Sequence, residues 1–147
     1  MTHRYHSHSL RKGRFSQQGR PYLVTFSTAG RSPWFSRFSI ACQVCRSIAQ
    51  SDIQNASHTW CYVVMPDHVH WLLSTTDKHD LSQIVRMAKA RVSRSLGQAI
   101  WQSSFHDRAL RSEAELKPAA RYVIANPVRA GLVASVRDYP FWNAAWL

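Results

Sequence analysis

The stretch that decides the fold is Trp60-Cys-Tyr-Val-Val-Met-Pro-Asp-His-Val-His-Trp-Leu-Leu-Ser74. Its two halves are rich in β-branched and aromatic residues, which are typical of strands. Between them, Met65-Pro-Asp-His68 has turn character, because proline presets one turn dihedral and aspartate tolerates turn geometry. The stretch therefore predicts two strands, Thr59–Met65 and His68–Thr75, paired as a hairpin.

His68 and His70 are one residue apart in the second of these strands. Side chains alternate along a strand, so both imidazoles point to one face while Val69, Trp71 and Leu73 point to the other and can pack into a core. A rigid strand that presents two imidazoles is suited to hold two ligands of a divalent metal. The alternative is a pair of structural histidines, which this spacing alone would favour.

Hydrophobic periodicity predicts the remaining elements. The expected segments are a strand Tyr22–Thr28, a helix Phe35–Ser51, a helix Leu81–Ile100 capped by Asp80, a strand within Trp101–Arg111, and a helix Glu113–Ala125. A capping box of Ser112 and Glu115 would start the last helix, although Pro118 belongs in a first turn. This order predicts an α+β, ferredoxin-like sandwich with helices packed on an antiparallel sheet of four to five strands.

The length of 147 residues suits one domain. We expect a basic, loosely ordered arm over residues 1–20 and a single domain over residues 21–147. No apolar run is long enough to span a bilayer, and the first residues lack signal-peptide character, so the sequence predicts a cytoplasmic protein.

Charge indicates the class of partner. The 19 Lys and Arg residues against 8 Asp and Glu give a formal charge of +11. Only four of the basic residues are lysines, and arginine favours bidentate phosphate contacts and stacking on bases. The basic residues are spread along the chain, which argues against a membrane-surface helix. We therefore expect a nucleic acid as the partner and no membrane.

Candidate DNA contacts lie in two regions. The polar face of the helix Leu81–Ile100 carries Arg86, Lys89 and Arg94, which could follow a phosphate backbone or simply be solvated. Trp101 and Phe105 could stack on unpaired bases, worth roughly 1–3 kcal/mol each. The alternative for these aromatic residues is burial in the core.

The segment from residue 121 to 133 carries further candidates. Tyr122 and Asn126 are four residues apart and share a helix face. Pro127 pushes Asn126 towards the helix end, where its carboxamide oxygen could turn to a metal. Arg121 and Arg129 flank the pair and could meet phosphates. Spacing alone favours a core tyrosine with Asn126 as a cap.

Three motifs together resemble those of a known family. They are Met65-Pro-Asp-His-Val-His70, Trp101-Gln-x-x-Phe-His-Asp107 and Arg121-Tyr-Val-Ile-Ala-Asn-Pro-Val-Arg-Ala-Gly-Leu132. In this order and spacing they are similar to the REP-associated tyrosine transposases, a bacterial branch of the single-tyrosine HUH transposases, which are insertion-sequence-200-like. The resemblance runs from about Tyr22 to the C-terminus.

The resemblance implies a site and a reaction. His68 and His70 would bind Mg²⁺ or Mn²⁺, with Asn126 as the third ligand. Tyr122 would attack phosphorus and leave a 5′-phosphotyrosine and a free 3′-hydroxyl. His106 and Asp107 are candidates for a supporting role.

The implied function is that of a single-stranded DNA endonuclease and strand transferase. Its substrate would be the hairpins of repetitive extragenic palindromes, and a monomer associated with the nucleoid is expected. A non-catalytic module that binds hairpin DNA or RNA is the alternative. A hydrolase that uses water is disfavoured, since only two glutamates, Glu113 and Glu115, occur.

Overall fold

The predicted hairpin lies inside the sheet of the computed structural model, which describes residues 19–146. β2 (Ser57–Met65) and β3 (His68–Thr75) pair antiparallel from Met65 opposite His68 at the turn to Ser57 opposite Thr75. The predicted arm, residues 1–20, falls almost entirely outside the described residues. In the described part, no helix is long and apolar enough to cross a bilayer.

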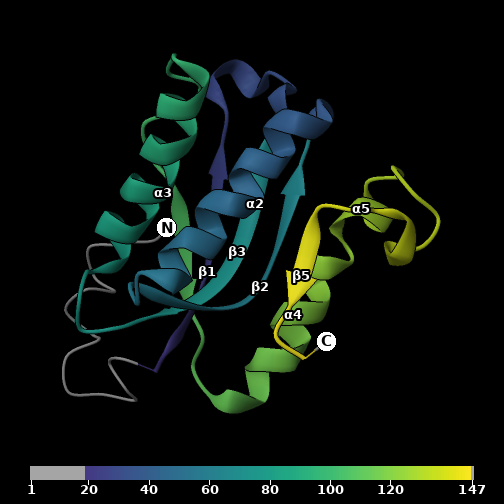
Figure 1. Cartoon of the computed structure of the whole chain (residues 1–147). Helices are drawn as coiled ribbons and strands as arrows, with labels where there is room; N and C mark the ends of the chain where they lie inside the picture. The colour runs from purple at the N-terminus through teal and green to yellow at the C-terminus, as the bar shows by residue number, and fades with distance from the viewer. Residues whose placement is uncertain (1–18, 147) are drawn as a thin grey trace.

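Three further strands complete the sheet. They are β1 (Pro21–Ser27), β4 (His106–Ala109) and β5 (Trp142–Ala144), and the order across the described sheet is β4-β1-β3-β2-β5 with every pair antiparallel. Figure 1 shows β5 beside β2 at one edge. The predicted α+β, ferredoxin-like sandwich is confirmed, although the sequence did not indicate the three-residue β5.

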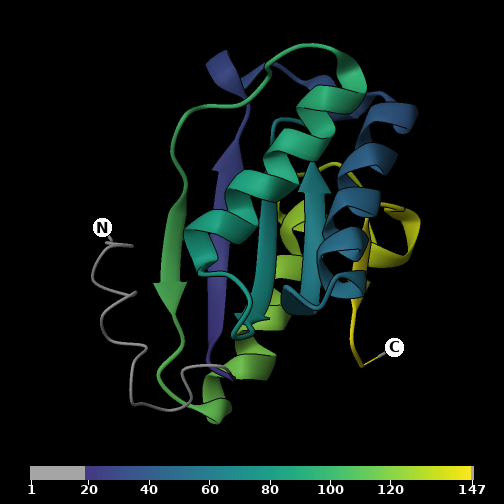
Figure 2. The same cartoon turned by 60° about the vertical axis from the view of Figure 1, so that its left-hand side comes forward.

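Helices cover both faces of the sheet. α2 (Phe38–Ile53) and α3 (Leu81–Leu96) lie side by side on one face, and α4 (Leu116–Ile124) lies on the other (Figure 2). Val69, Trp71 and Leu73 of β3 are buried in the cluster that includes α2 and α3. The predicted alternation of β3 is therefore confirmed, and its other face turns towards α4.

Short helical segments connect these elements. They are η1 (Ala29–Arg31), η2 (Trp34–Ser36), η3 (Glu113–Glu115), α5 (Asn126–Arg129) and η4 (Val136–Asp138).

The start of α3 confirms the predicted cap. The Asp80 side chain accepts a hydrogen bond from the Gln83 backbone N–H at 2.8 Å, and the Gln83 side chain accepts one from the Asp80 N–H at 3.0 Å. The helix ends at Leu96, short of the predicted Ile100, because Gly97 adopts a left-handed conformation with φ of 75°.

The predicted capping box at the start of α4 is wrong. Ser112 makes no side-chain capping bond, and η3 precedes the helix. The Glu115 carboxylate instead accepts from the Arg111 backbone N–H at 3.3 Å and from the Arg108 guanidinium at 3.5 Å. The regular helix begins at Leu116, which leaves Pro118 in the first turn, where proline is tolerated.

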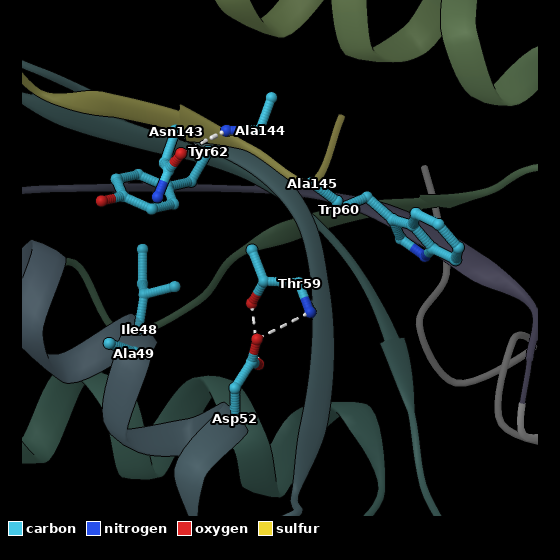
Figure 3. A pocket seen from close by; sticks show the side chains of 9 residues that line it. All are labelled: Ile48, Ala49, Asp52, Thr59, Trp60, Tyr62, Asn143, Ala144 and Ala145. Carbon is cyan, nitrogen blue, oxygen red and sulfur yellow. Dashed lines mark hydrogen bonds between the residues drawn. The ribbon is translucent and has the colours of Figure 1, made fainter. Parts of the chain in front are cut away.

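One carboxylate fixes the connection between α2 and β2. Asp52 accepts hydrogen bonds from the Thr59 backbone N–H at 3.0 Å and the Thr59 hydroxyl at 2.9 Å (Figure 3). The surface hollow drawn there is lined by residues of α2, β2 and β5, with Ile48 on one side and Asn143 on the other. Since Ile48 belongs to the cluster under α2 and α3, this hollow is separate from the face that carries the histidine pair.

Candidate active site

His68 and His70 lie on the face of the sheet that α4 covers. Leu72, which continues their alternation on β3, packs in the same cluster as Val123 of α4. The two imidazole rings are perpendicular, with centroids 4.9 Å apart. At this separation both rings can act as neighbouring ligands of one ion, given metal–nitrogen bonds of about 2.1 Å.

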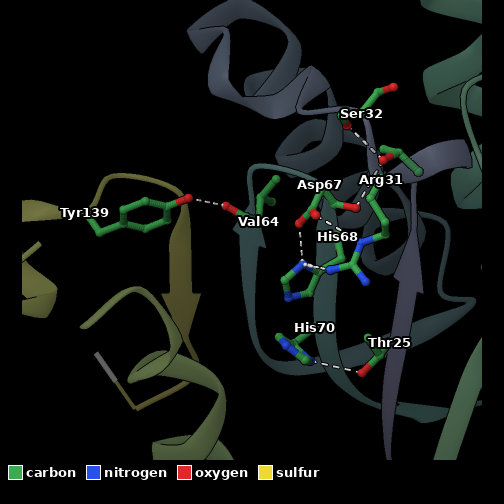
Figure 4. Close-up of polar contacts among 9 residues, drawn as sticks. Thr25, Arg31, Ser32, Val64, Asp67, His68, His70 and Tyr139 are labelled. Atoms are coloured by element: carbon green, nitrogen blue, oxygen red, sulfur yellow. Dashed lines mark hydrogen bonds and ion pairs between the residues drawn. The ribbon is translucent and has the colours of Figure 1, made fainter. Parts of the chain in front are cut away.

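One nitrogen of each imidazole faces an oxygen of the protein. His68 Nδ1 is 2.7 Å from Asp67 Oδ1, and His70 Nδ1 is 2.9 Å from Thr25 Oγ1 (Figure 4). Metal-binding histidines usually donate their second ring N–H to such an oxygen, which orients the ring. Because Nδ1 of each ring faces a protein oxygen, Nε2 is the nitrogen that remains for another partner.

The charge states suit a cation. Burial, followed by the neighbouring His68 and Arg129, lowers the pKa of His70 to about 4, so this imidazole is neutral at physiological pH. Burial would raise the pKa of Asp67, but the hydrogen bonds and charges of His68 and Arg31 outweigh burial and lower it. The site thus combines a neutral imidazole with an ionised carboxylate nearby.

Tyr122 of α4 comes next to the pair. Its ring centroid is 6.2 Å from that of His70, and half of its side chain is exposed. The Arg129 guanidinium lies 4.1 Å from the centre of the Tyr122 ring and donates to the Tyr122 carbonyl at 2.9 Å. The structure therefore joins the predicted nucleophile to the predicted metal ligands, and adds a positive charge.

Asn126 is the first residue of α5, two residues after α4 ends at Ile124, so it lies just beyond the helix end near which its place before Pro127 predicts it. Its amide nitrogen donates to the carbonyls of Tyr122 and Val123, both at 3.1 Å. This pairing uses the amide nitrogen and leaves the carboxamide oxygen as the group that could accept a metal. Its role as the third ligand stays a prediction.

The side chains around the histidine pair do not settle which metal they would hold. Between residues 19 and 146, no group of three or more His, Cys, Asp or Glu side chains could hold a metal. A third protein ligand for His68 and His70 would therefore come from another residue type, and a carboxamide oxygen is such a group. Oxygen ligands suit Mg²⁺ and Mn²⁺, whereas imidazoles also suit zinc or copper.

The two supporting candidates lie on opposite faces. His106 of β4 is in register with Thr25, which in turn pairs with His70, so these three residues form one row across the face of the sheet that carries the histidine pair. Asp107 pairs with Val24, whose side chain is in the cluster under α2 and α3, and Asp107 is itself buried. Only His106 shares the face of the candidate site.

The basic candidates divide in the same way. Arg86, Lys89 and Arg94 belong to α3, on the face opposite the histidine pair. Lys89 is half-buried, which lowers its pKa, and it donates to the Gln102 carbonyl at 2.8 Å. Arg121 is exposed on α4, beside Tyr122. A contact of the three α3 residues with DNA stays a prediction, and they do not line this site.

The aromatic candidates take part in the core. Trp101 donates its indole N–H to the Lys89 carbonyl at 3.0 Å, and its ring packs on Phe26 and Phe35 at centroid distances of 5.1 and 5.4 Å. Phe105 packs against the same cluster. These contacts favour the core alternative over stacking on bases.

Sequence reasoning missed three residues that hold the histidines. Thr25 and Arg31 come from β1 and η1, far from the motif in sequence. The register of β1 on β3 brings Thr25 to His70, and the turn after β1 brings Arg31 to Asp67. Asp67 directly precedes His68, and a carboxylate next to a paired histidine was a signal for it. The sequence assigned Asp67 only to the turn.

Comparisons with known proteins place the chain. The family described as "Transposase IS200 like" matches residues 21–118, which is more than half of the chain and ends before Tyr122. The REP-associated tyrosine transposase of Escherichia coli (strain K12) is 35% identical over 83 residues, covering 54% of this chain and 50% of that protein. A protein from Haemophilus influenzae described as "Putative REP-associated tyrosine transposase" is 27% identical over 95 residues, covering 53% of each chain.

The chain thus spans about half the length of the curated relatives that it matches. A solved structure of a REP-associated tyrosine transposase bound to a REP hairpin superposes with a TM-score of 0.75 and 24% identity, over 88% of this chain and 79% of that one. This likeness shows the fold. The matches agree with the resemblance seen in the motifs, and the chain belongs to the family of IS200-like transposases.

Proposed function

We propose that the chain is a metal-dependent single-stranded DNA endonuclease and strand transferase that works through a covalent 5′-phosphotyrosine. The observation that carries this proposal is the approach of Tyr122 to His70, with ring centroids 6.2 Å apart and the tyrosine half-exposed. A purely structural tyrosine has no need of an oriented histidine pair beside it.

The proposed metal site uses Nε2 of His68 and His70 and the carboxamide oxygen of Asn126. A bound Mg²⁺ or Mn²⁺ would supply Lewis-acid polarisation of the scissile phosphate and offset its developing charge. Arg129, next to the Tyr122 ring, brings a positive charge to the place where a phosphate would approach the phenol.

The proposed reaction conserves the phosphodiester. Tyr122 Oη forms a bond to phosphorus and loses its proton, while the bond to the 3′-oxygen breaks and leaves a 3′-hydroxyl. Attack by the 3′-hydroxyl of another strand reverses these changes, rejoins DNA and restores the phenol. Transfer to water instead would yield a hydrolase.

For the substrate we propose REP-type hairpins. The formal charge of +11 favours a polyanion, and a domain of this size has little room to open a duplex. Relatives named for REP elements, and a neighbour in structure whose title gives a bound REP hairpin, support this class. We propose a monomer that works in the cytoplasm at the nucleoid.

A covalent-complex assay tests the function. Labelled single-stranded hairpin DNA is incubated with the protein, with Mg²⁺ or Mn²⁺ or with EDTA, and run on a denaturing gel. We expect a metal-dependent protein–DNA band that Tyr122→Phe abolishes. Tyr62→Phe, which removes a phenol from the opposite face of the sheet, is the matched control and should keep the band.

The other outcomes select the alternatives. Cleavage that survives Tyr122→Phe would refute the tyrosine mechanism and favour a hydrolase. Salt-sensitive binding without cleavage, across hairpins of varied sequence, would instead favour a hairpin-binding module.

A further inference from the structure

Asp67 holds two partners with its two carboxylate oxygens. Oδ1 is 2.7 Å from His68 Nδ1, and Oδ2 accepts from Arg31 Nε at 2.9 Å (Figure 4). Rotation of the carboxylate would break both contacts. The Asp67 side chain is only a quarter exposed, so water competes little for these positions.

The backbone of Asp67 is fixed as well. Its carbonyl accepts from the Thr28 backbone N–H at 3.0 Å and from the Thr28 hydroxyl at 3.2 Å. Thr28 is fully buried. The carboxylate therefore projects from a turn tied to the end of β1.

The contacts of Asp67 decide where the proton of His68 sits. A carboxylate paired with a guanidinium offers only lone pairs, so the nitrogen facing it at 2.7 Å carries hydrogen. Arg31 Nη2 is 3.4 Å from the same nitrogen, but a guanidinium is a donor and cannot bond to a protonated Nδ1. In the neutral imidazole, a hydrogen on Nδ1 leaves the lone pair on Nε2.

No comparable partner fixes the tautomer of His70. Its Nδ1 faces the Thr25 hydroxyl, which can donate or accept. The two histidines are therefore held differently: only His68 has a partner that dictates its tautomer.

Arg31 reaches Asp67 from an unusual backbone. Its φ is 55°, directly after Gly30 at 63°, and a side chain other than glycine is seldom found in this left-handed region. Residues held in such conformations cluster at functional sites, where surrounding contacts maintain them. In this conformation the Arg31 side chain reaches the Asp67 carboxylate.

We propose that Asp67 and Arg31 are positioning residues that hold His68 in the tautomer with a bare Nε2, ready to bind a divalent cation. Asp67 orients the imidazole and sets its proton, and Arg31 orients Asp67. The inference rests on the proposed function insofar as His68 is a metal ligand.

The test follows the His68 ring and the cation separately. Nitrogen-15 NMR of the imidazoles, without metal or DNA, reports the tautomer, and titration with Mn²⁺ followed by electron paramagnetic resonance reports affinity. For Asp67→Ala we expect a mixture of tautomers at His68 and Mn²⁺ binding weakened by roughly 10–100-fold. Asp67→Asn replaces one acceptor oxygen by a donor NH₂, which must face either Arg31 or His68 Nδ1, so it should also shift His68 away from the Nδ1–H form and weaken Mn²⁺ binding.

One control and one further variant complete the test. Asp77→Ala removes an exposed carboxylate elsewhere and should match wild type in both readouts. For Arg31→Ala, which leaves Asp67 in place, we expect a smaller loss of affinity in the same direction. If Arg31→Ala matched wild type in both readouts, the proposed positioning role of Arg31 would be refuted.

A His68 ring that keeps the Nδ1–H form in Asp67→Ala would overturn the proposal. Failure of the proposed function looks different: wild type would show no Mn²⁺ binding, while the effect of Asp67 on the tautomer would persist.

Discussion

His70 is the residue of the candidate site that is most restricted by its surroundings. It is 8% exposed, hydrogen-bonded through Nδ1 to Thr25, and next to Tyr122 and Arg129. Its burial and the nearby positive charge keep it neutral. A histidine must be neutral at the nitrogen that binds a metal. Keeping His70 neutral lowers the stability of the folded protein in acid.

We predict that His70 makes the metal-free protein sensitive to acid. The pKa of this histidine is about 4 in the folded chain against 6.5 for the ordinary value, so between these values the unfolded chain binds more protons. The free energy of unfolding should therefore fall as pH drops from about 6.5 to 4, by up to the order of 3 kcal/mol from this residue.

Urea denaturation across this range checks the prediction. His70→Gln should show a shallower fall than wild type, since carboxylates contribute equally to both proteins. Parallel pH profiles would contradict the assignment.

At the scale of elements, the C-terminal segment is attached to the sheet by a few directed bonds. The buried Tyr139 hydroxyl donates to the Val64 carbonyl at 2.6 Å, and the Val64 N–H donates to the Phe141 carbonyl at 2.9 Å. Burial raises the pKa of Tyr139 to about 12, so the phenol keeps its proton to donate. β5 follows directly and extends the sheet beyond β2.

We predict that Tyr139→Phe lowers the free energy of unfolding by about 1–3 kcal/mol, because the buried Val64 carbonyl loses its donor. Thermal or denaturant unfolding measures this change. Tyr122→Phe is the matched control, since its exposed ring should tolerate the loss of a hydroxyl within about 0.5 kcal/mol. Equal losses in both variants would show that the bond to Val64 is not the cause.

The whole molecule presents two basic faces. On the face of the sheet that α4 covers, Arg129 of α5 lies over the Tyr122 ring and Arg121 is exposed on α4. Arg86 and Arg94 lie on α3, across the sheet. A short hairpin that reaches Tyr122 has its phosphates nearest to the α4 face. The basic residues that are spread along the sequence therefore fall on two faces of the sheet. One face carries the candidate site, and the other is remote from it.

We predict that Arg121→Ala weakens hairpin binding and reduces the slope of log affinity against log salt by about 1. Arg86→Ala and Arg94→Ala should change the slope much less. Fluorescence anisotropy over a range of salt concentrations compares the three variants. A larger loss from the α3 variants would place the main DNA contact on the opposite face.

The sequence by itself determined the local features of this protein. Alternation along His68–Thr75 placed two imidazoles on one face and Val69, Trp71 and Leu73 on the other. Asp80, as an N-cap residue, predicted the start of α3. These features depend on neighbours within a few residues, whose periodicity or capping chemistry can be read along the chain. The motifs also indicated the family.

Only the tertiary structure decided which distant side chains meet. Register between β1 and β3 sets Thr25 against His70, and the docking of α4 on the sheet sets Tyr122 beside it. The turn after β1 brings Arg31 to Asp67. Such contacts depend on how separate elements pack their apolar faces against one another. The spacing of residues within one segment does not predict how that segment packs on the others.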